Sequence, residues 1–251
     1  MSAFARGTTP EGAGTEQEAA LFVRGMFGRI ARRYDLANHL LSGNLDPWWR
    51  AQTVRRVRHV LQRDGARVLD ICCGTGDLTL ALERGAKPAA TIMGSDFCHP
   101  MLVSARDKIA RRSIRAPLFE SDALRLPVRD GALDLLTVAF GFRNLTNYRA
   151  GLEEIRRVLK PGGTCAILEF SQPRNRAFGA LYNLYSRRIL PVIGGLVTGE
   201  SRAYRYLPES VRKFPGAIEL AEEMRAAGFV DVRFELMTGG VVALHLGRSD
   251  A

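Results

Sequence analysis

Residues 68–77 read VLDICCGTGD, and this stretch decides the predicted fold. The run Arg67–Ile71 is largely apolar and bounded by polar residues and glycines, which is typical of a buried parallel strand. The glycines then turn the chain, and Leu78, Ala81 and Leu82 follow at the spacing of one helical face. A strand, a tight glycine turn and a helix predict a ligand at the carboxyl end of an open α/β sheet.

The residues around the loop indicate which ligand it binds. The GxGxxG pattern of dinucleotide sites lacks its third glycine here, because Thr79 stands in that place. Asp70 before the loop and Asp77 after it would repel a pyrophosphate but suit a cationic group. Ser95 and Asp96 end the next predicted strand, where a carboxylate can hold ribose hydroxyls. Adenosine with a cationic tail indicates S-adenosylmethionine; a strand–loop–helix turn without a ligand is the alternative.

Composition sets limits on the fold and the partners. With 251 residues, the chain fits one α/β domain. Its net charge of +10 favours nucleic acid, an anionic membrane or an acidic partner, although solvated basic faces would give the same charge. No apolar run approaches the roughly 18–20 residues of a membrane span, and no secretory signal is evident. The four cysteines form no CxxC pair, so we expect neither a disulfide nor a metal site, and a reducing cytoplasm.

Strands and helices alternate along the middle of the chain, which is the pattern of a parallel sheet. Strands are predicted near 67–71, 90–95, 116–121, 133–139 and 163–170, with helices near 77–84, 99–112 and 148–159. A closing hairpin is predicted near 229–237 and 241–247. This order predicts an α/β class I methyltransferase fold, a Rossmann-like seven-stranded sheet with an antiparallel final hairpin.

The sequence also predicts a domain organisation. Residues 1–18 are expected to form a disordered tail, and residues 19–251 a single methyltransferase domain. An N-terminal helical cap (19–64) is basic, with ten arginines against three aspartates between residues 21 and 67, and could cover the cofactor or lie on a membrane. Its second helix is predicted to begin with Asp46 as N-cap. An insertion at 174–213 is expected to roof an apolar substrate pocket.

Two further segments carry candidate site residues. Asp122 follows the third predicted strand, where its carboxylate and a neighbouring amide could bind adenine, although a surface turn is the alternative. Residues 140–145, FGFRNL, follow the fourth strand and are expected to face the methyl group and the substrate. They lack the acid-or-Asn-Pro-Pro-aromatic sequence of methylases that act on nucleobase amines, which disfavours such a substrate.

Five segments together resemble the ubiquinone/menaquinone biosynthesis C-methyltransferase family. These are FVRGMFGRIARRYDLAN at 22–38, DPWWR at 46–50, CGTGD at 73–77, FGFRNL at 140–145 and YLPESVRKFP at 206–215. The resemblance covers about residues 20–248. It departs at Gly28, where the family usually has an aspartate, which affects only that local contact.

The resemblance implies C-methylation of a polyprenylated quinol ring, most directly demethylmenaquinol to menaquinol. The ubiquinone-pathway reaction, both reactions, an RNA or other small-molecule methyltransferase, and a noncatalytic scaffold are the alternatives. By family analogy, Thr75, Asp96, Asp122 and Ala123 bind S-adenosylmethionine, with the backbone around Ala139. With the loop residues, the expected cofactor set is Asp70, Gly74, Thr75, Gly76, Asp96, Asp122, Ala123 and Ala139, without a metal.

Catalysis of this kind needs alignment, a dry pocket and a positive group that favours the phenolate. Arg143 is the expected positive group, acting with Asn144; it stays protonated and does not abstract the proton. Tyr34, Phe140 and Phe142 are expected to contact the substrate or the methionine end of the cofactor.

The remaining expectations concern a base and the surroundings of the protein. His39 and His99 are candidate bases, although such histidines are more often structural. The expected partners are the quinol, an anionic membrane contacted peripherally and a second copy in a homodimer, with no specific nucleic acid. The expected location is the cytoplasm, with peripheral contact at the inner face of the cell membrane.

Overall fold

The computed structural model describes residues 7–112, 114–173, 175, 179–180, 182, 184–185, 188 and 199–250. These residues form a seven-stranded sheet of order β3-β2-β1-β4-β5-β7-β6. The strands are β1 Arg67–Ile71, β2 Thr91–Asp96, β3 Leu118–Glu120, β4 Leu133–Ala139, β5 Leu159–Phe170, β6 Phe229–Met237 and β7 Val242–Ser249. β1 to β5 pair in parallel, whereas β7 pairs antiparallel with both β5 and β6. The predicted fold class is confirmed.

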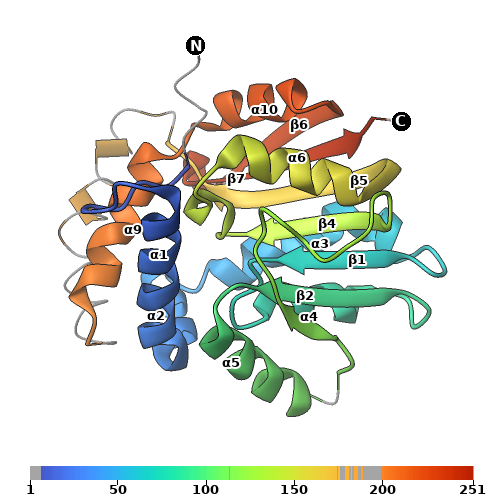
Figure 1. The fold of residues 1–251 in the computed structure, drawn as a ribbon, viewed down its shortest axis with the longest axis horizontal. Helices are drawn as coiled ribbons and strands as arrows, with labels where there is room; N and C mark the ends of the chain where they lie inside the picture. The colour runs from blue at the N-terminus through green and yellow to red at the C-terminus, as the bar shows by residue number, and fades with distance from the viewer. Residues whose placement is uncertain are drawn as a thin grey trace.

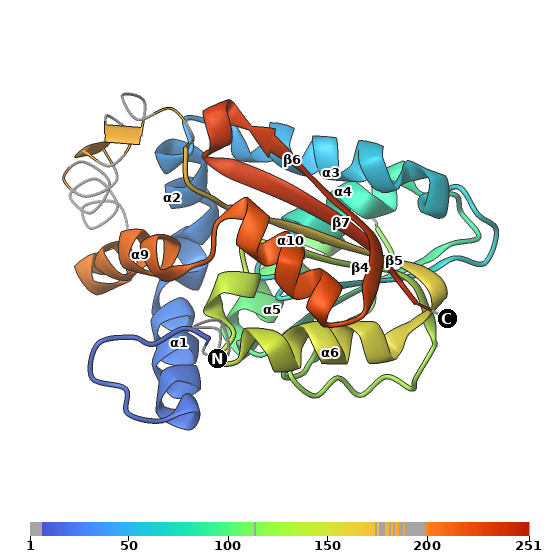
Figure 2. The ribbon, with the colours of Figure 1, turned by 90° about the horizontal axis from the view of Figure 1, so that it is seen from above.

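Helices cover both faces of this sheet and its carboxyl edge. They are α1 Glu16–Ile30, α2 Tyr34–Leu41, α3 Asp46–Leu61, α4 Asp77–Gly85, α5 His99–Ala110, α6 Tyr148–Val158, α9 Ser201–Lys213 and α10 Ala217–Ala226, with the short 3-10 helices η2 Ala31–Arg33, η3 Phe142–Asn144 and η5 Thr238–Gly240. α3 and α4 lie on one face, and α6 and α10 on the other (Figure 2). Within the described part of the chain, no helix is long and apolar enough to cross a membrane.

The core follows from the apolar pattern of these elements. On one face, Leu152 and Ile155 of α6 and Leu220 of α10 pack against buried residues of β4 and β5. On the other, Val57 of α3 and Leu82 of α4 pack against β1, β4 and β7. Burial on both sides explains why β1 and β4 are almost continuous apolar runs.

A third cluster packs the helices of the cap against one another and against Met101 of α5. Val23, Met26 and Ile30 of α1 pack with Leu41 of α2 and Tyr206 of α9. Figure 1 shows α1, α2 and α9 beyond the arrowheads of the parallel strands. The cap therefore stands where ligands bind in open α/β sheets. Much of the predicted insertion at 174–213 lies outside the described residues, so its role as a roof stays a prediction.

The N-terminal segment differs from the predicted disordered tail at 1–18. Within its described part, the Gly7 amide donates to the Thr146 carbonyl (3.0 Å) and the Thr8 amide to that of Leu145 (2.7 Å). α1 already begins inside the predicted tail. A side chain at Gly7 would collide with the backbone there. The polar composition that suggested disorder is compatible with this segment because its backbone groups pair with a distant loop.

Candidate active site

The glycine loop between β1 and α4 has the geometry that its sequence predicts. Gly74 and Gly76 have positive φ angles of 56° and 82°, a region that glycine enters without strain. A Cβ on Gly76 would lie 3.2 Å from the Cβ of Ala105 in α5, so the glycine also permits close packing. Gly74 borders two of the cavities described below, whereas Gly76 borders none of them. Gly76 therefore shapes the loop.

Asp70 lies at the end of β1 beneath this loop. Its carboxylate is 1% exposed and accepts hydrogen bonds from the hydroxyls of Thr79 (2.6 Å) and Thr137 (2.8 Å). Burial raises the pKa of Asp70 to about 7, against the lowering effect of these hydrogen bonds. Asp70 borders a loop cavity of about 30 Å³ together with Gly74 and Thr75.

Asp96 ends β2 and holds the loop through the backbone. Its two carboxylate oxygens accept from the amides of Gly74 and Cys98, each at 2.8 Å. Burial raises the pKa of Asp96 to about 6. Asp96 borders an edge cavity of about 80 Å³ that Asp122, Ala123 and Ala139 also line.

The edge cavity suits the adenosine part of S-adenosylmethionine. Its carboxylates, Asp96 and Asp122, can accept from ribose hydroxyls and from an exocyclic amine. Phe97, Ala123 and Leu124 add apolar surface of the kind that holds a flat base. The carboxylates and the apolar surface of the edge cavity therefore fit the adenosine part of the predicted cofactor.

The helical cap closes over the glycine loop through charged contacts. The Thr75 hydroxyl donates to Asp35 of α2 (2.5 Å), and the Lys108 ammonium lies 2.6 Å from a carboxylate oxygen of both Asp35 and Asp77. Tyr34 precedes Asp35 and borders all three cavities. The expected contact of Tyr34 with the methionine end of the cofactor stays a prediction. The Thr75 side chain, by contrast, is already engaged by the cap.

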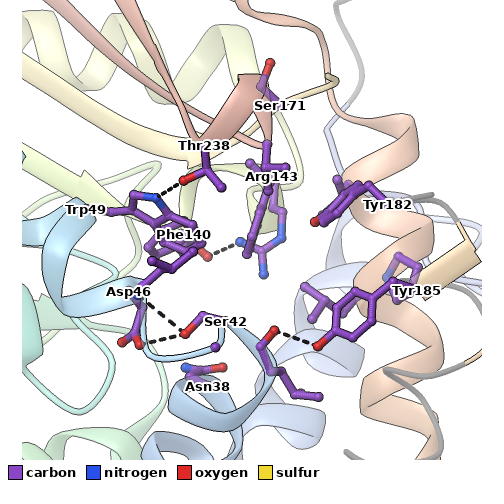
Figure 3. A pocket seen from close by; sticks show the side chains of 18 of the residues that line it. Asn38, Ser42, Asp46, Trp49, Phe140, Arg143, Ser171, Tyr182, Tyr185 and Thr238 are labelled. Atoms are coloured by element: carbon purple, nitrogen blue, oxygen red, sulfur yellow. Dashed lines mark hydrogen bonds between the residues drawn. The ribbon is translucent and has the colours of Figure 1, made fainter. Parts of the chain in front are cut away.

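A large cavity of about 570 Å³ adjoins the edge cavity, and Tyr34 and Phe140 border both. Figure 3 shows it between the cap, the end of the sheet, Tyr182 and Tyr185. Its wall is mainly aromatic and aliphatic, with few charged groups. Such a cavity suits a largely apolar substrate that carries a small polar end.

Like Arg50, Arg143 is a buried cation of the large cavity. It is 4% exposed, its Nη1 donates to the Glu169 carboxylate (2.9 Å) and to the Phe140 carbonyl, and its guanidinium lies 5.3 Å from the centre of the Phe170 ring. Burial acts to lower the pKa of Arg143, but electrostatic interactions with Glu169, Tyr34 and Tyr206 together raise it overall. Arg143 Nε is buried and has no hydrogen-bond partner among the described residues. Arg143 borders the large cavity, and Figure 3 shows its guanidinium among the lining side chains.

Asn144 lies at the boundary between the two larger cavities. It borders the edge cavity, and its Oδ1 accepts from the hydroxyl of Tyr206, which borders the large cavity (3.0 Å). The Tyr206 hydroxyl lies 2.7 Å from the Thr8 hydroxyl. The N-terminal segment and α9 thus fix the orientation of Asn144.

The two phenylalanines of the 140–145 segment have different positions. Phe140 borders both cavities and has a positive φ of 58°, unusual for a residue with a bulky side chain. Phe142 is fully buried, stacked on Tyr148 (ring centres 5.7 Å apart) and edge-on to Phe214 (6.2 Å). It borders no described cavity, so the expectation that Phe142 contacts the substrate is corrected: the backbone turns into η3 there and directs the ring into the core.

Two acidic residues of the site were missed by sequence reasoning. Asp46 lies in the first turn of α3 after Leu45, and its carboxylate is bound by Arg50, Ser42 (2.8 Å) and His39 (2.9 Å), so it is not the predicted N-cap. Burial acts to raise the pKa of Asp46, but its partners lower it overall. The candidate base His39 is therefore a hydrogen-bond partner of the Asp46 carboxylate.

Glu169, the second missed residue, is 1% exposed near the end of β5. It binds Arg143 through side chain and backbone. A lone acid in the apolar run CAILEF was the available signal, because a buried carboxylate requires a partner. The other candidate base, His99, is exposed and lies 3.1 Å from Glu120.

Comparisons with known proteins agree with this geometry. A model of the ubiE/COQ5 methyltransferase family matches residues 14–249. A demethylmenaquinone methyltransferase of Thermus thermophilus is 50% identical over 88% of this chain and 99% of that protein. One from Deinococcus radiodurans is 44% identical over 93% and 95%. A ubiquinone/menaquinone biosynthesis C-methyltransferase UbiE of Stutzerimonas stutzeri is 40% identical over 92% and 90%.

Solved structures show the same fold at low sequence identity. A methyltransferase of Thermotoga maritima, described as S-adenosylmethionine-dependent and a possible histamine N-methyltransferase, superposes with a TM-score of 0.61 at 18% identity, over 90% of this chain and 99% of that one. An S-adenosylmethionine-dependent methyltransferase of Aquifex aeolicus gives 0.57 at 18%, over 79% and 89%. With a family model that spans almost the whole sequence, the predicted resemblance is confirmed: the chain belongs to the ubiE/COQ5 methyltransferase family.

Proposed function

We propose that this enzyme methylates a ring carbon of a polyprenylated quinol with S-adenosylmethionine, converting demethylmenaquinol to menaquinol. The observation that carries the proposal is the buried guanidinium of Arg143, which borders a large apolar cavity that adjoins the edge cavity at Tyr34 and Phe140. The relatives from Thermus thermophilus and Deinococcus radiodurans, both named for this reaction, support it.

The chain's own residues provide what the reaction requires. S-adenosylmethionine, when bound, supplies an electrophilic methyl group. A quinol carbon becomes nucleophilic as the neighbouring hydroxyl loses its proton to water, and the Arg143 guanidinium favours the resulting negative oxygen. The ring carbon takes the methyl group and loses its own proton to water, with the demethylated cofactor as the leaving group. A preorganised donor of this kind contributes about 10²–10³-fold to turnover. The buried Glu169 holds the guanidinium in place.

Asp46 is the only carboxylate among the described residues that line the large cavity. Its lowered pKa keeps it charged at neutral pH, so it can accept a hydrogen bond from a ring hydroxyl. In this proposal Arg143 and Asp46 orient the two oxygens of the quinol, while Trp49, Phe140 and Phe170 exclude water from the ring.

The cofactor roles follow the same logic. Asp96 binds the ribose hydroxyls, Asp122 and Ala123 bind the adenine, and Asp70 stabilises the loop that faces the cationic end. Asn144, which borders the edge cavity, contacts the substrate where the two cavities adjoin. The ubiquinone-pathway reaction is the second candidate, because relatives near 40% identity are named for both quinones. The proposal includes a cytoplasmic enzyme that contacts the inner face of the cell membrane.

A labelling assay tests the proposal. Demethylmenaquinol and the demethylated ubiquinol precursor are offered in parallel with S-adenosylmethionine labelled in its methyl group. Label in the first alone is expected, and label in both would identify a dual enzyme. Label in neither, from a protein that binds the cofactor, would overturn the proposal.

A further inference from the structure

Four large apolar side chains are exposed within one stretch of the cap. Leu36 and Leu40 on α2, Leu45 in the following loop and Trp48 in the first turn of α3 are 62%, 52%, 39% and 46% exposed. The other large apolar side chains with comparable exposure in the described part of the chain are Leu21, Val103, Leu184, Ile218 and Val230. We call residues 36, 40, 45 and 48 the port surface.

α2 presents apolar residues to solvent as well as to the core. Ala37 and Leu41 are buried in the cap, as expected for the inner face of an amphipathic helix. Leu36 and Leu40 lie one turn apart on the outer face, where charged or polar residues are the norm. A cluster of exposed apolar residues of this kind marks an interaction site.

The port surface continues into the large cavity. Leu40 and Leu45 are exposed to solvent and also border the cavity. Inside, Met26, Phe27 and Ile30 of α1 extend the apolar wall. A hydrocarbon chain attached to a ring near Arg143 could therefore follow an apolar path to the surface.

The charges around the port surface suit an anionic partner. Arg32 and Arg33, which are exposed, immediately precede α2. The acids of the same stretch are engaged: Asp35 pairs with Lys108, and Asp46 is buried against Arg50. Apolar side chains flanked by arginines are typical of protein surfaces that bind anionic lipid bilayers.

We propose that the port surface docks on an anionic bilayer and admits the polyprenyl tail of the substrate directly into the large cavity. This inference rests on the proposed function and assigns its membrane contact to the side chains of the port surface. A lipid surface fits better than a second copy of the chain, because a permanent interface at Leu40 and Leu45 would cover the entrance that the substrate needs.

Vesicle binding tests the docking. Wild type and the double variant Leu36→Ser/Trp48→Ser are sedimented with vesicles of phosphatidylcholine containing phosphatidylglycerol, and with phosphatidylcholine alone. We expect the variant to bind the anionic vesicles at least tenfold more weakly. Ile218→Ser on α10, equally exposed at 53%, is the matched control and should bind like wild type. Equal binding by all three proteins would overturn the proposal.

Methylation rates with two quinols separate membrane docking from methyl transfer. Neither Leu36 nor Trp48 borders the large cavity, so the double variant should methylate a quinol with one isoprene unit, in solution, within twofold of wild type. With the long-tailed quinol in anionic vesicles, its rate should fall at least tenfold. A wild type inactive on both quinols would instead overturn the proposed function.

Light scattering tests whether a second copy of the chain binds the port surface instead of a bilayer. The proposal expects Leu36→Ser/Trp48→Ser to leave the molar mass of the protein in solution unchanged. A wild-type dimer that the variant dissociates would show that the port surface binds a second copy, and would overturn the docking on lipid.

Discussion

The edge cavity and the large cavity adjoin each other but are built in different ways. The edge cavity takes its polar groups from the ends of β2 and of β3, with Asp96 and Asp122 only 26 residues apart in sequence. The large cavity draws on segments from Met26 to Val241. The carboxylates for the cofactor thus come from neighbouring strand ends, whereas the residues of the substrate site come from segments far apart in sequence.

Their electrostatics differ as well. Asp70 and Asp96 accept hydrogen bonds from hydroxyls or backbone amides, and burial raises both pKa values. Asp46 is paired with Arg50, and Glu169 with Arg143, in ion pairs at the large cavity. The first arrangement lets a cationic ligand favour the charged forms of Asp70, at the loop cavity, and Asp96, at the edge cavity, whereas the second fixes the charges that orient a neutral ligand.

The largest effect is expected at the ion pair of the large cavity. Replacing Arg143 by Ala should lower kcat by about 10²–10³-fold, because a preorganised donor to the phenolate is lost. It also leaves Glu169 buried without its partner, which typically costs about 3–5 kcal/mol of folding free energy. Initial rates and urea unfolding measure the two effects.

The double variant Arg143→Ala/Glu169→Ala separates the loss of turnover from the loss of stability. It removes both charges, so stability should recover relative to the single variant while kcat stays low. Arg149→Ala, which breaks the exposed pair with Glu153, is the control and should leave both quantities nearly unchanged. If turnover returned with stability, Arg143 would have no role beyond folding.

The next effect concerns the edge cavity alone. Asp96→Asn should weaken S-adenosylmethionine binding by about 10–100-fold, the equivalent of roughly 1.5–3 kcal/mol for a hydrogen bond to a charged group. In wild type, affinity should fall as the pH is lowered through 6, because the pKa of Asp96 is raised to about 6 and the protonated acid accepts ribose hydroxyls poorly. Calorimetric titration at pH 5 and pH 8 checks both.

The control for Asp96 is Asp64→Asn, an exposed carboxylate that does not border the edge cavity. Its affinity should match wild type at both pH values. A pH profile that Asp96→Asn does not flatten would assign the titration to another group.

Phe140 and Phe142 offer a matched pair across the boundary. Phe142→Leu should lower the free energy of unfolding by about 1–2 kcal/mol and leave KM for the quinol unchanged, since its ring lies in the core. Phe140→Leu should raise KM severalfold, because its ring borders the large cavity. Urea unfolding and quinol titrations measure these effects, and the reverse assignment would restore Phe142 to the substrate site.

The smallest effect is expected at the contact that links the two cavities. Tyr206→Phe removes one hydrogen bond to Asn144, worth about 0.5–1.5 kcal/mol, and should lower kcat by roughly 2–10-fold. Tyr185→Phe, which loses a bond to the Leu41 carbonyl elsewhere in the same cavity, is the control and should leave kcat unchanged. Equal losses would mean that Asn144 needs no positioning by Tyr206.

The part of the site predicted from sequence is the part that local geometry determines. In a parallel sheet the carboxyl ends of adjacent strands share one edge, so the acids after successive strands could be grouped without any tertiary contact. The loop glycines were recognisable because their positive φ angles strongly favour that residue.

The remainder depended on contacts that no local pattern encodes. In a strand, Phe140 and Phe142 would lie on the same face, because they are two residues apart. The chain instead enters η3 at Phe142, so the two side chains point in different directions. Asp46 has the pattern of an N-cap, yet His39 and Arg50 bind it. The predicted tail at 1–18 was inferred from polar composition, while its partners lie about 140 residues away.

The close contact of Gly7 with the backbone near Thr146 has a consequence for biosynthesis. At roughly 5–20 residues per second, the ribosome makes residue 146 about 7–28 s after residue 7, and Tyr206 later still. The segment at Gly7 therefore stays without this partner while the intervening residues are made. The contacts that join Thr8, Tyr206 and Asn144 at the boundary of the two cavities form only after Tyr206 has been synthesised.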